Sequence, residues 1–397
     1  MPRLVNWEKC CGCGACASKC PRTAISMQAN CEGFLHPVVD MEKCVECGAC
    51  EKVCSGLEPS RNSDAILKVF IVQHKDDAIR YQSTSGGAFT AIAEEIIRRG
   101  GAVFGAVMTD ELIAKHDCAF NYDELAKFRN SKYVQSEIGD CYKQVKEFLQ
   151  VGRHVCFSGT PCQINGLYKY LGKDYDNLIT VDVVCKSIPS PLVFRKYVEY
   201  KKIKEGDFTD VVFRDKKRGF LYCTMAHYLS DEDRKASKDI YRRGSESDEW
   251  LRLFLSGNIS RHSCMTCPYQ TVNRVGDFTL GDIWETGNTL FDDNGGTTLV
   301  HVWTKKGSSF LDTIKSNVRL EMYPIKKSRS VERMNSIQVT SNRKQLFEDA
   351  NHLSAEAFFT KYAPNTLKIR IKQKGRYLLW RIGLQNMVRH MKHLIIH

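Results

Sequence analysis

Cysteines at two regular spacings near the start of the chain are the residues most able to do chemistry. Each run has the form Cys-x2-Cys-x2-Cys-x3-Cys, and the second run begins 34 positions after the first. Three close thiolates suit one [4Fe–4S] cubane, and the fourth cysteine of each run ligates the other cluster. This rule assigns one cluster to Cys10, Cys13, Cys16 and Cys54, and the other to Cys44, Cys47, Cys50 and Cys20.

The spacing is that of bacterial two-cluster ferredoxins, and its repetition indicates an internal duplication with pseudo-twofold symmetry. Pro21 follows the first run, whereas Ser55 replaces the usual proline after the second, at a position that supplies no ligand. Paired Cys-x2-Cys units can also bind zinc. However, a zinc ribbon uses four ligands per site and does not need the third cysteine step that each run contains, so zinc is the weaker interpretation. A disulfide framework would suit a small secreted domain, and no signal peptide precedes Trp7. Cys11 and Cys31 fall outside the pattern and are interpreted as spare thiols.

Length and composition limit the remaining possibilities. After the cysteine module about 340 residues are left, enough for one large domain or two modest ones. No apolar run is long enough to span a membrane. The chain has 18 cysteines, and without an export signal they predict a reducing cytoplasm in which thiolates bind metals. Exposed low-potential clusters also suggest an anaerobic or microaerobic host.

The net charge of +12 is concentrated at the end of the chain. From Pro324 onward there are fifteen Lys or Arg and four Asp or Glu. A general nucleic-acid-binding character is therefore not indicated, whereas a basic C-terminal extension is. Residues 366–397 carry no acid, and apolar residues recur there at an imperfect helical spacing. Such a tail can lie on an anionic membrane, dock an acidic partner or pack on the body of the protein.

Three separated segments contain further cysteines. Cys162 is expected to begin a helix after one strand, Cys185 to end the next strand, and Cys264 and Cys267 form a Cys-x2-Cys loop. Neighbouring parallel strand ends with a loop folded over them could gather four thiolates. A third iron–sulfur cluster, a zinc site and ordinary buried cysteines all remain open on spacing alone.

Loops of small residues precede two expected helices. Hydroxyls and glycines at a helix N-terminus can hold a phosphate, or they can simply cap the helix and allow close packing. Lys132 adds a cation nearby in the chain, and Asp282 and Trp284 could lie beside a planar ligand or form a turn. The small residues of the two loops are Ser83, Thr84, Ser85, Gly86 and Gly87, and then Gly159 and Thr160.

The elements that must position these residues alternate between strands and helices. We expect strands at 67–72, 102–107, 154–157, 178–184, 278–280 and 298–304, and helices at 87–99, 138–149, 161–171, 191–200 and 308–316. This alternation predicts an α/β domain, with α+β character overall, built on a largely parallel sheet. The polar segment 231–261, with an apolar helical piece at 250–255, is interpreted as a cover over a site.

In order along the chain, the motifs QSTSGGAF, RNSKYVQS, FSGTPCQI, VVCKSIPSP, SCMTC and TLGDIW resemble the coenzyme F420 hydrogenase/dehydrogenase beta-subunit family. The resemblance runs from the first cysteine run to about Thr304, with a two-cluster ferredoxin fused in front. The expected domains are a ferredoxin-type domain at 1–58, a linker at 56–64, a family-like domain at 65–323 and a basic, helical extension at 324–397.

The resemblance implies an FAD-binding domain with its own [4Fe–4S] cluster near the flavin. The family's cluster cysteines fall on Cys162, Cys185, Cys264 and Cys267. FAD contacts would fall on the 83–87 loop with Lys132, and on Gly159, Thr160 and Asp282. Lys186 follows the second cluster cysteine where relatives often carry another polar residue, which puts in doubt a proton-transfer role at that position.

These features predict an iron–sulfur flavoprotein oxidoreductase that passes electrons among three clusters and FAD, to or from a small-molecule substrate that the fold does not name. The alternatives are an electron-relay subunit without a metabolite substrate and a coenzyme F420-dependent subunit. The expected partners are a ferredoxin or another oxidoreductase subunit. A membrane surface or acidic partner is a further expectation for the basic tail.

Overall fold

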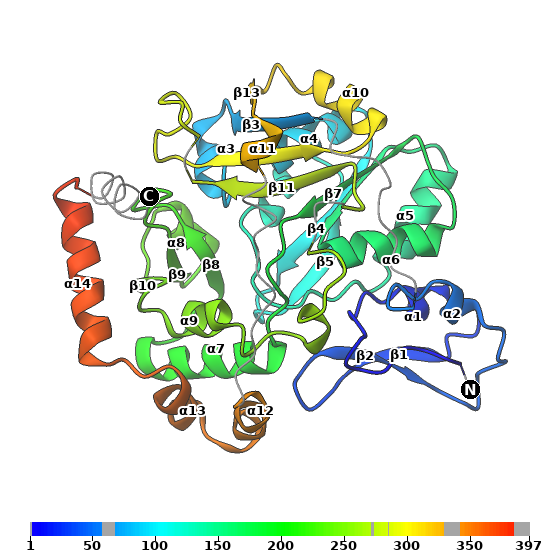
Figure 1. The fold of residues 1–397 in the computed structure, drawn as a ribbon, viewed down its shortest axis with the longest axis horizontal. Coiled ribbons are helices and arrows are strands. Elements are labelled where there is room, and N and C mark those ends of the chain that lie inside the picture. The colour runs from blue at the N-terminus through cyan, green and yellow to red at the C-terminus, as the bar shows by residue number, and fades with distance from the viewer. Residues whose placement is uncertain (1, 58–67, 271–273, 285, 329–341, 385–397) are drawn as a thin grey trace.

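The computed structural model describes residues 2–57, 68–270, 274–284, 286–328 and 342–384. It confirms the mixed α/β class, with a small N-terminal module beside a larger α/β body (Figure 1). Most of the expected linker, residues 58–64, lies outside the described residues. Among the residues described, we find no helix whose length and hydrophobicity would suit a transmembrane span.

The N-terminal module reflects the sequence duplication in its backbone. Each half begins its helix directly after a glycine in the left-handed conformation, Gly14 with φ 74° and Gly48 with φ 69°. Gly12 and Glu46, also 34 positions apart, share positive φ values. The elements of the module are α1 (Ala15–Lys19), β1 (Ile25–Ala29), β2 (Leu35–Val39) and α2 (Ala49–Lys52), with β1 and β2 antiparallel.

The body is built on an eight-stranded sheet in the order β13-β3-β12-β11-β7-β6-β4-β5. Strands β11, β7, β6 and β4 are parallel neighbours, and β12 and β5 are antiparallel to theirs. Its strands are β3 (Lys68–His74), β4 (Ala102–Met108), β5 (Ala114–Ala119), β6 (Val155–Gly159), β7 (Leu178–Val183), β11 (Phe278–Ile283), β12 (Thr297–Val302) and β13 (Val318–Met322). The carboxyl ends of the parallel strands therefore meet at one edge, where ligands bind in open α/β sheets.

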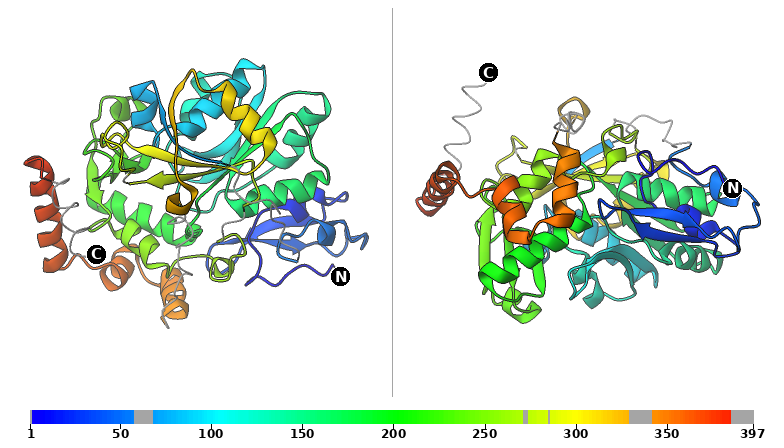
Figure 2. Two further views of the ribbon diagram at one scale, coloured as in Figure 1. Left: turned by 45° about the horizontal axis from the view of Figure 1, so that its top comes forward. Right: turned by 90° about the horizontal axis from the view of Figure 1, so that it is seen from below.

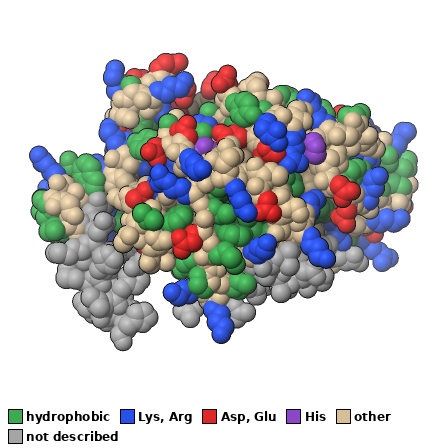
Figure 3. All heavy atoms as spheres, turned by 90° about the horizontal axis from the view of Figure 1, so that it is seen from above, with side chains coloured by type: hydrophobic (Ala, Val, Ile, Leu, Met, Phe, Trp, Pro, Cys, Tyr) green, Lys and Arg blue, Asp and Glu red, His purple; other side chains and the backbone are tan. Residues whose placement is uncertain are grey.

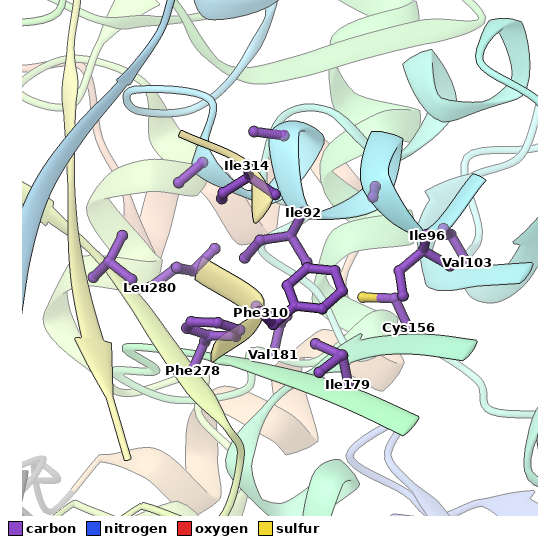
Figure 4. Close-up of a cluster of buried hydrophobic side chains, with 14 of the residues drawn as sticks. Ile92, Ile96, Val103, Cys156, Ile179, Val181, Phe278, Leu280, Phe310 and Ile314 are labelled. Atoms are coloured by element: carbon purple, nitrogen blue, oxygen red, sulfur yellow. The ribbon is translucent and has the colours of Figure 1, made fainter. Parts of the chain in front are cut away.

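Helices cover both faces of this sheet. On one face α4 and α10 bury apolar residues against β7, β11 and β12, among them Ile92, Ile96 and Phe310 (Figure 4). On the other face α5 and α6 pack against the N-terminal module. The helices of the body are α3 (Asp77–Gln82), α4 (Ala88–Arg98), α5 (Cys141–Gln150), α6 (Pro161–Leu171), α10 (Lys305–Thr313) and α11 (Ile325–Ser328), with the 3-10 helices η1 (Asp123–Phe128) and η2 (His262–Cys264).

A second core lies beside a three-stranded antiparallel sheet of order β10-β9-β8. Trp250 is fully buried there against Phe194 and Tyr197. The elements around it are α7 (Pro191–Glu205), β8 (Asp210–Asp215), β9 (Thr224–Tyr228), α8 (Asp231–Lys235), β10 (Tyr241–Gly244) and α9 (Glu249–Ser256). The interpretation of 231–261 as a cover is therefore wrong for most of that segment, because its apolar side chains fill a core and its strand completes a sheet.

The C-terminal extension is helical, as expected, but its first part is no appendage. Helices α12 (Arg343–His352) and α13 (Ala355–Tyr362) bury Phe347, Phe358 and Phe359 in the second core. Asn351 Nδ2 also donates to the carbonyl of Cys31, at 2.8 Å, and so ties α12 to the N-terminal module. Within the described part of the extension, α14 (Leu367–Arg381) buries no residue and lies at the edge of the molecule in each view of Figure 2. The residues expected to continue its apolar spacing beyond 384 lie outside the described part.

Candidate functional site

The eight regularly spaced cysteines line two separate pockets in the N-terminal module. One pocket is lined by Cys10, Cys13, Cys16 and Cys54, and the other by Cys20, Cys44, Cys47 and Cys50. Each pocket thus takes three cysteines from one run and the fourth from the other, which is the exchange expected for two cubanes. The donor set fits two [4Fe–4S] clusters.

The two pockets differ in their surroundings. In the first, burial raises the pKa of the Cys10 thiol, and the nearby Arg261 guanidinium opposes that rise. Its backbone also contributes, because the Gly12 amide lies 3.4 Å from Cys10 Sγ as a hydrogen-bond donor. In the second pocket Cys47 is exposed, as is Val45 beside it. Hydrogen bonds to sulfur, burial and nearby charge set the potentials of such clusters, so the two sites are not equivalent.

Arg261 anchors the N-terminal module to the body. It is fully buried, its Nε donates to the Cys10 carbonyl at 2.6 Å, and its Nη2 donates to the Leu35 carbonyl at 2.9 Å. Its guanidinium also approaches His36. Burial, and then the charge of Arg261, lower the pKa of His36 to about 3. His36 is therefore neutral at pH 7 and can accept a hydrogen bond from Arg261. The charge beside the first pocket is thus that of Arg261 alone in this pair.

Helix α6 brings another cysteine to this interface. Cys11, interpreted as a spare thiol from the sequence, contacts both Cys13 and Cys162. The Cys13 contact lowers the pKa of Cys11, but the Cys162 contact and burial raise it, and the pKa lies well above its usual range. Gly166, one turn further along α6, allows the close approach: a Cβ there would lie 3.0 Å from Cys13 Sγ. Cys162 therefore lies next to the first cluster pocket.

The other three cysteines of the expected third site lie together. Burial, and then the neighbouring thiols of Cys264 and Cys267, raise the pKa of Cys185. Cys264 also accepts from the Ile188 amide at 3.4 Å, and burial raises its pKa to about 12. Cys267 packs against the same apolar cluster as Cys162. Within the described part of the chain, no three His, Cys, Asp or Glu residues converge closely enough for a single metal ion.

The structure brings the 83–87 loop, an expected FAD contact, against the loop that contains Lys132. Thr84 Oγ1 accepts from the Ser131 amide at 2.6 Å and lies 3.0 Å from the Ser131 hydroxyl. Helix α4 then begins after Gly87, whose φ of 86° favours glycine. Arg129 belongs to the same loop as Ser131, and its buried Nε has no partner among the described residues. These groups could meet an anionic ligand.

Other residues of the expected FAD site already have partners within the protein. The Gly86 amide donates to Thr298 Oγ1 at 2.8 Å, and the Ser85 hydroxyl donates to the Thr297 carbonyl. The Ser83 hydroxyl donates to the Ile79 carbonyl at 2.8 Å. Lys132 Nζ donates to the carbonyls of residues 127 and 129, and burial lowers its pKa to about 7. Lys132 therefore shapes the loop that contains Ser131.

Asp282 lies at the carboxyl end of β11 and pairs with Arg214. The Arg214 guanidinium lies 5.0 Å from the Trp284 ring, which is 44% exposed. Arg214 Nη2 is buried without a partner among the described atoms, and the Arg214 carbonyl accepts from the Asn130 side chain. The 129–132 loop, Arg214 and Asp282 are thus contiguous, and they offer cationic and planar groups of the kind a flavin nucleotide requires.

Gly159 and Thr160 begin α6 next to Cys162. Thr160 and Gln163 form a capping box, and Thr160 Oγ1 lies 3.2 Å from Cys162 Sγ. His116 donates from Nε2 to the Ser158 carbonyl at 3.0 Å, and burial lowers its pKa to about 4. Its Nδ1 is therefore an unprotonated acceptor that no described group occupies.

Three residues of this region were missed from the sequence: Arg261, Arg214 and His116. Arg261 lies three positions before Cys264, and Arg214 lies at the end of β8, but neither position carries a local signal. His116 lies in a short strand that was not expected. Their significance arises from contacts between segments far apart in the chain.

The cysteine pockets and the mixed sheet define an iron–sulfur protein with a ferredoxin-type module. Residues 9–55 match the 4Fe-4S dicluster domain family. Residues 152–328 match the family described as the C terminus of the beta subunit of coenzyme F420 hydrogenase/dehydrogenase. The resemblance stated from the motifs is therefore confirmed.

Comparison with solved structures finds a chain of the F420-reducing [NiFe] hydrogenase complex from Methanosarcina barkeri, in a study of xenon derivatization. The two chains are 15% identical over 72% of this chain and 92% of the other, with a TM-score of 0.47. No curated protein matches the chain.

Proposed function

We propose that the protein is an iron–sulfur flavoprotein oxidoreductase in which electrons pass between the ferredoxin-type module and an FAD site at the carboxyl edge of the large sheet. The observation that carries this proposal is the position of Cys162, which lies against Cys11, itself in contact with Cys13, at the junction of the module and the body. A third cluster held by Cys162, Cys185, Cys264 and Cys267 would occupy the step between the two.

In this proposal different residues serve the entry of electrons, the position of the clusters and the binding of FAD. The exposed pocket around Cys47 is where a donor or acceptor protein can approach. Arg261 fixes the first pocket against the body, and Gly166 allows the contact with α6. Thr84, Ser131 and the unpartnered nitrogens of Arg129 and Arg214 are the groups that would hold the anionic and planar parts of FAD. FAD exchanges one or two electrons, whereas a cluster exchanges one.

Iron, sulfide and flavin quantitation after anaerobic purification tests this proposal. We expect about twelve irons, three cubanes of four, and one FAD for each chain. A reconstituted protein with eight irons and bound FAD would rule out the third cluster. A protein with twelve irons and no FAD would rule out the flavin site.

A second candidate is an electron-relay subunit without its own metabolite. The exposed second pocket supports it, since a partner protein could reach the cluster there directly. A spectral assay distinguishes the two candidates. If the reduced protein alone transfers its electrons to a small molecule, it is a complete enzyme; if it does not, it is a relay subunit. Addition of coenzyme F420 tests that substrate in the same assay, and we expect no change in its spectrum.

A further inference from the structure

Helix α14 exposes a narrow apolar stripe on the side that faces away from the protein. Leu367, Ile371, Leu378 and the C-cap residue Ile382 are 71%, 61%, 56% and 53% exposed. Their spacings of four, seven and four residues place them on one face of a helix. No residue of α14 is buried, so this stripe has no cover within the described structure.

Cations border the stripe on both sides. At 100° for each residue, Arg370, Lys374 and Arg381 flank one side, and Lys368 and Lys372 flank the other. All five are exposed, and α14 contains no acidic residue. Figure 3 shows basic and hydrophobic side chains next to one another at the left edge of the molecule, where α14 lies.

The opposite face of α14 is fixed to the body, which holds the stripe outward. Arg376 Nη1 donates to Glu246 at 2.6 Å, and Arg243 donates to Gln373 at 2.9 Å. The Arg218 guanidinium lies 4.7 Å from the ring of Tyr377. The orientation of the helix is thus set by polar and cation–π contacts on its inner face.

From this arrangement we infer that α14 binds an anionic lipid surface. A stripe of aliphatic side chains along an outermost helix, flanked by cations, matches the acyl boundary and the charged headgroups of such a surface. An acidic protein would need the cations but gives no reason for four exposed aliphatic residues in line. The protein would thereby be a peripheral membrane protein with its ferredoxin module on the far side (Figure 1).

Vesicle co-sedimentation of the full chain tests this inference. The probes are phosphatidylcholine vesicles with and without phosphatidylglycerol, at low and high salt. We expect binding to the anionic vesicles, weakened by salt, and about tenfold weaker binding for the Ile371→Asp/Leu378→Asp variant and for Lys368→Gln/Lys372→Gln. Sedimentation without vesicles and iron content verify that each variant folds.

Matched substitutions elsewhere serve as controls. Ile203, which is 64% exposed on α7, gives the control Ile203→Asp, and the exposed Lys344 and Lys238 give the double charge control Lys344→Gln/Lys238→Gln. Both controls should bind as the original chain does. Absence of binding to anionic vesicles overturns the inference. Binding to anionic vesicles that depends on the cations but not on Ile371 and Leu378 also overturns it, because the apolar stripe would then take no part in the contact.

Discussion

The guanidinium of Arg261 donates to the carbonyl of Cys10 across 2.6 Å, and 251 residues separate the two in the chain. One buried side chain thus joins the body directly to the backbone of a cluster ligand. Because the same guanidinium is a cation beside the first pocket, it affects both the position and the electrostatics of that site.

Replacement of Arg261 by Met should lower the reduction potential of the first cluster by tens of millivolts, since loss of a nearby positive charge disfavours the added electron. EPR-monitored redox titration measures this shift. The exposed Arg195 on α7 gives the control Arg195→Met, which should leave both potentials unchanged. An unchanged potential in Arg261→Met with intact iron content would contradict the electrostatic role.

Gly166→Ala should disturb the contact between the module and α6. The added Cβ would lie 2.9 Å from Tyr142 Oη and 3.0 Å from Cys13 Sγ, so one partner must shift. We expect lower iron content, measured on the purified protein. Gly375 in α14 is the matched helical glycine, with open space around its position. Gly375→Ala should retain all iron and stabilise the helix by up to about 1 kcal/mol. Equal iron content in the two variants would show that α6 tolerates the methyl group.

The proposed third cluster predicts a difference between two neighbouring cysteines. Cys162→Ser should remove about four of twelve irons, because a proposed ligand is lost. Cys11→Ser should retain all of them, since Cys11, although it lines the first pocket and contacts Cys13 and Cys162, belongs to neither regularly spaced set of four cysteines. Iron analysis with EPR of the reduced proteins makes the comparison. Loss of iron in Cys11→Ser but not in Cys162→Ser would show that Cys11, and not Cys162, is a cluster ligand.

Thr84→Val should weaken FAD binding by about fivefold, because one hydroxyl hydrogen bond at the proposed nucleotide site contributes on the order of 1 kcal/mol. Equilibrium dialysis of FAD measures this effect. Ser83→Ala is the control, since the Ser83 hydroxyl donates to its own helix. The flavin contact of Thr84 is refuted if both variants bind FAD equally well.

The stability of the protein should depend on Lys132 above neutral pH. Burial lowers the pKa of Lys132 to about 7 from an ordinary 10.5. Between these values the unfolded chain binds more protons than the folded one, so the free energy of unfolding rises with pH. Below pH 7 this group opposes folding fully. Thermal midpoints from pH 7 to 9.5, at one scan rate, should rise more steeply for the original chain than for Lys132→Gln. Parallel profiles for the two proteins would contradict the lowered pKa.

The sequence predicted the parallel part of the large sheet well because its elements are buried and strongly periodic. The helix expected at 161–171 is α6 with the same bounds, since Thr160 and Pro161 are strong start signals. The small sheet was missed for the opposite reason. Arg214 and Asp215 are buried at the end of β8, where their charges are paired, and buried charges give a strand the composition of a loop.

The site was predictable to the extent that it is local in the chain. The exchange of Cys20 and Cys54 between pockets follows from spacing alone. The contact of Cys11 with Cys162 and the link between Thr84 and Ser131 depend on tertiary packing. No periodicity or short motif reports such a contact.

The unequal burial of the two pockets has a consequence for handling the protein in air. Cys47 of the second pocket is exposed, so dioxygen should reach that side readily, whereas Cys10, Cys13 and Cys16 of the first pocket are buried and α6 approaches Cys13 closely. Oxidative damage should therefore proceed inward, with the outer cubane bleached while the inner one still persists. A sample briefly exposed to air would retain its buried redox centre but lose the site at which we propose that a partner protein docks.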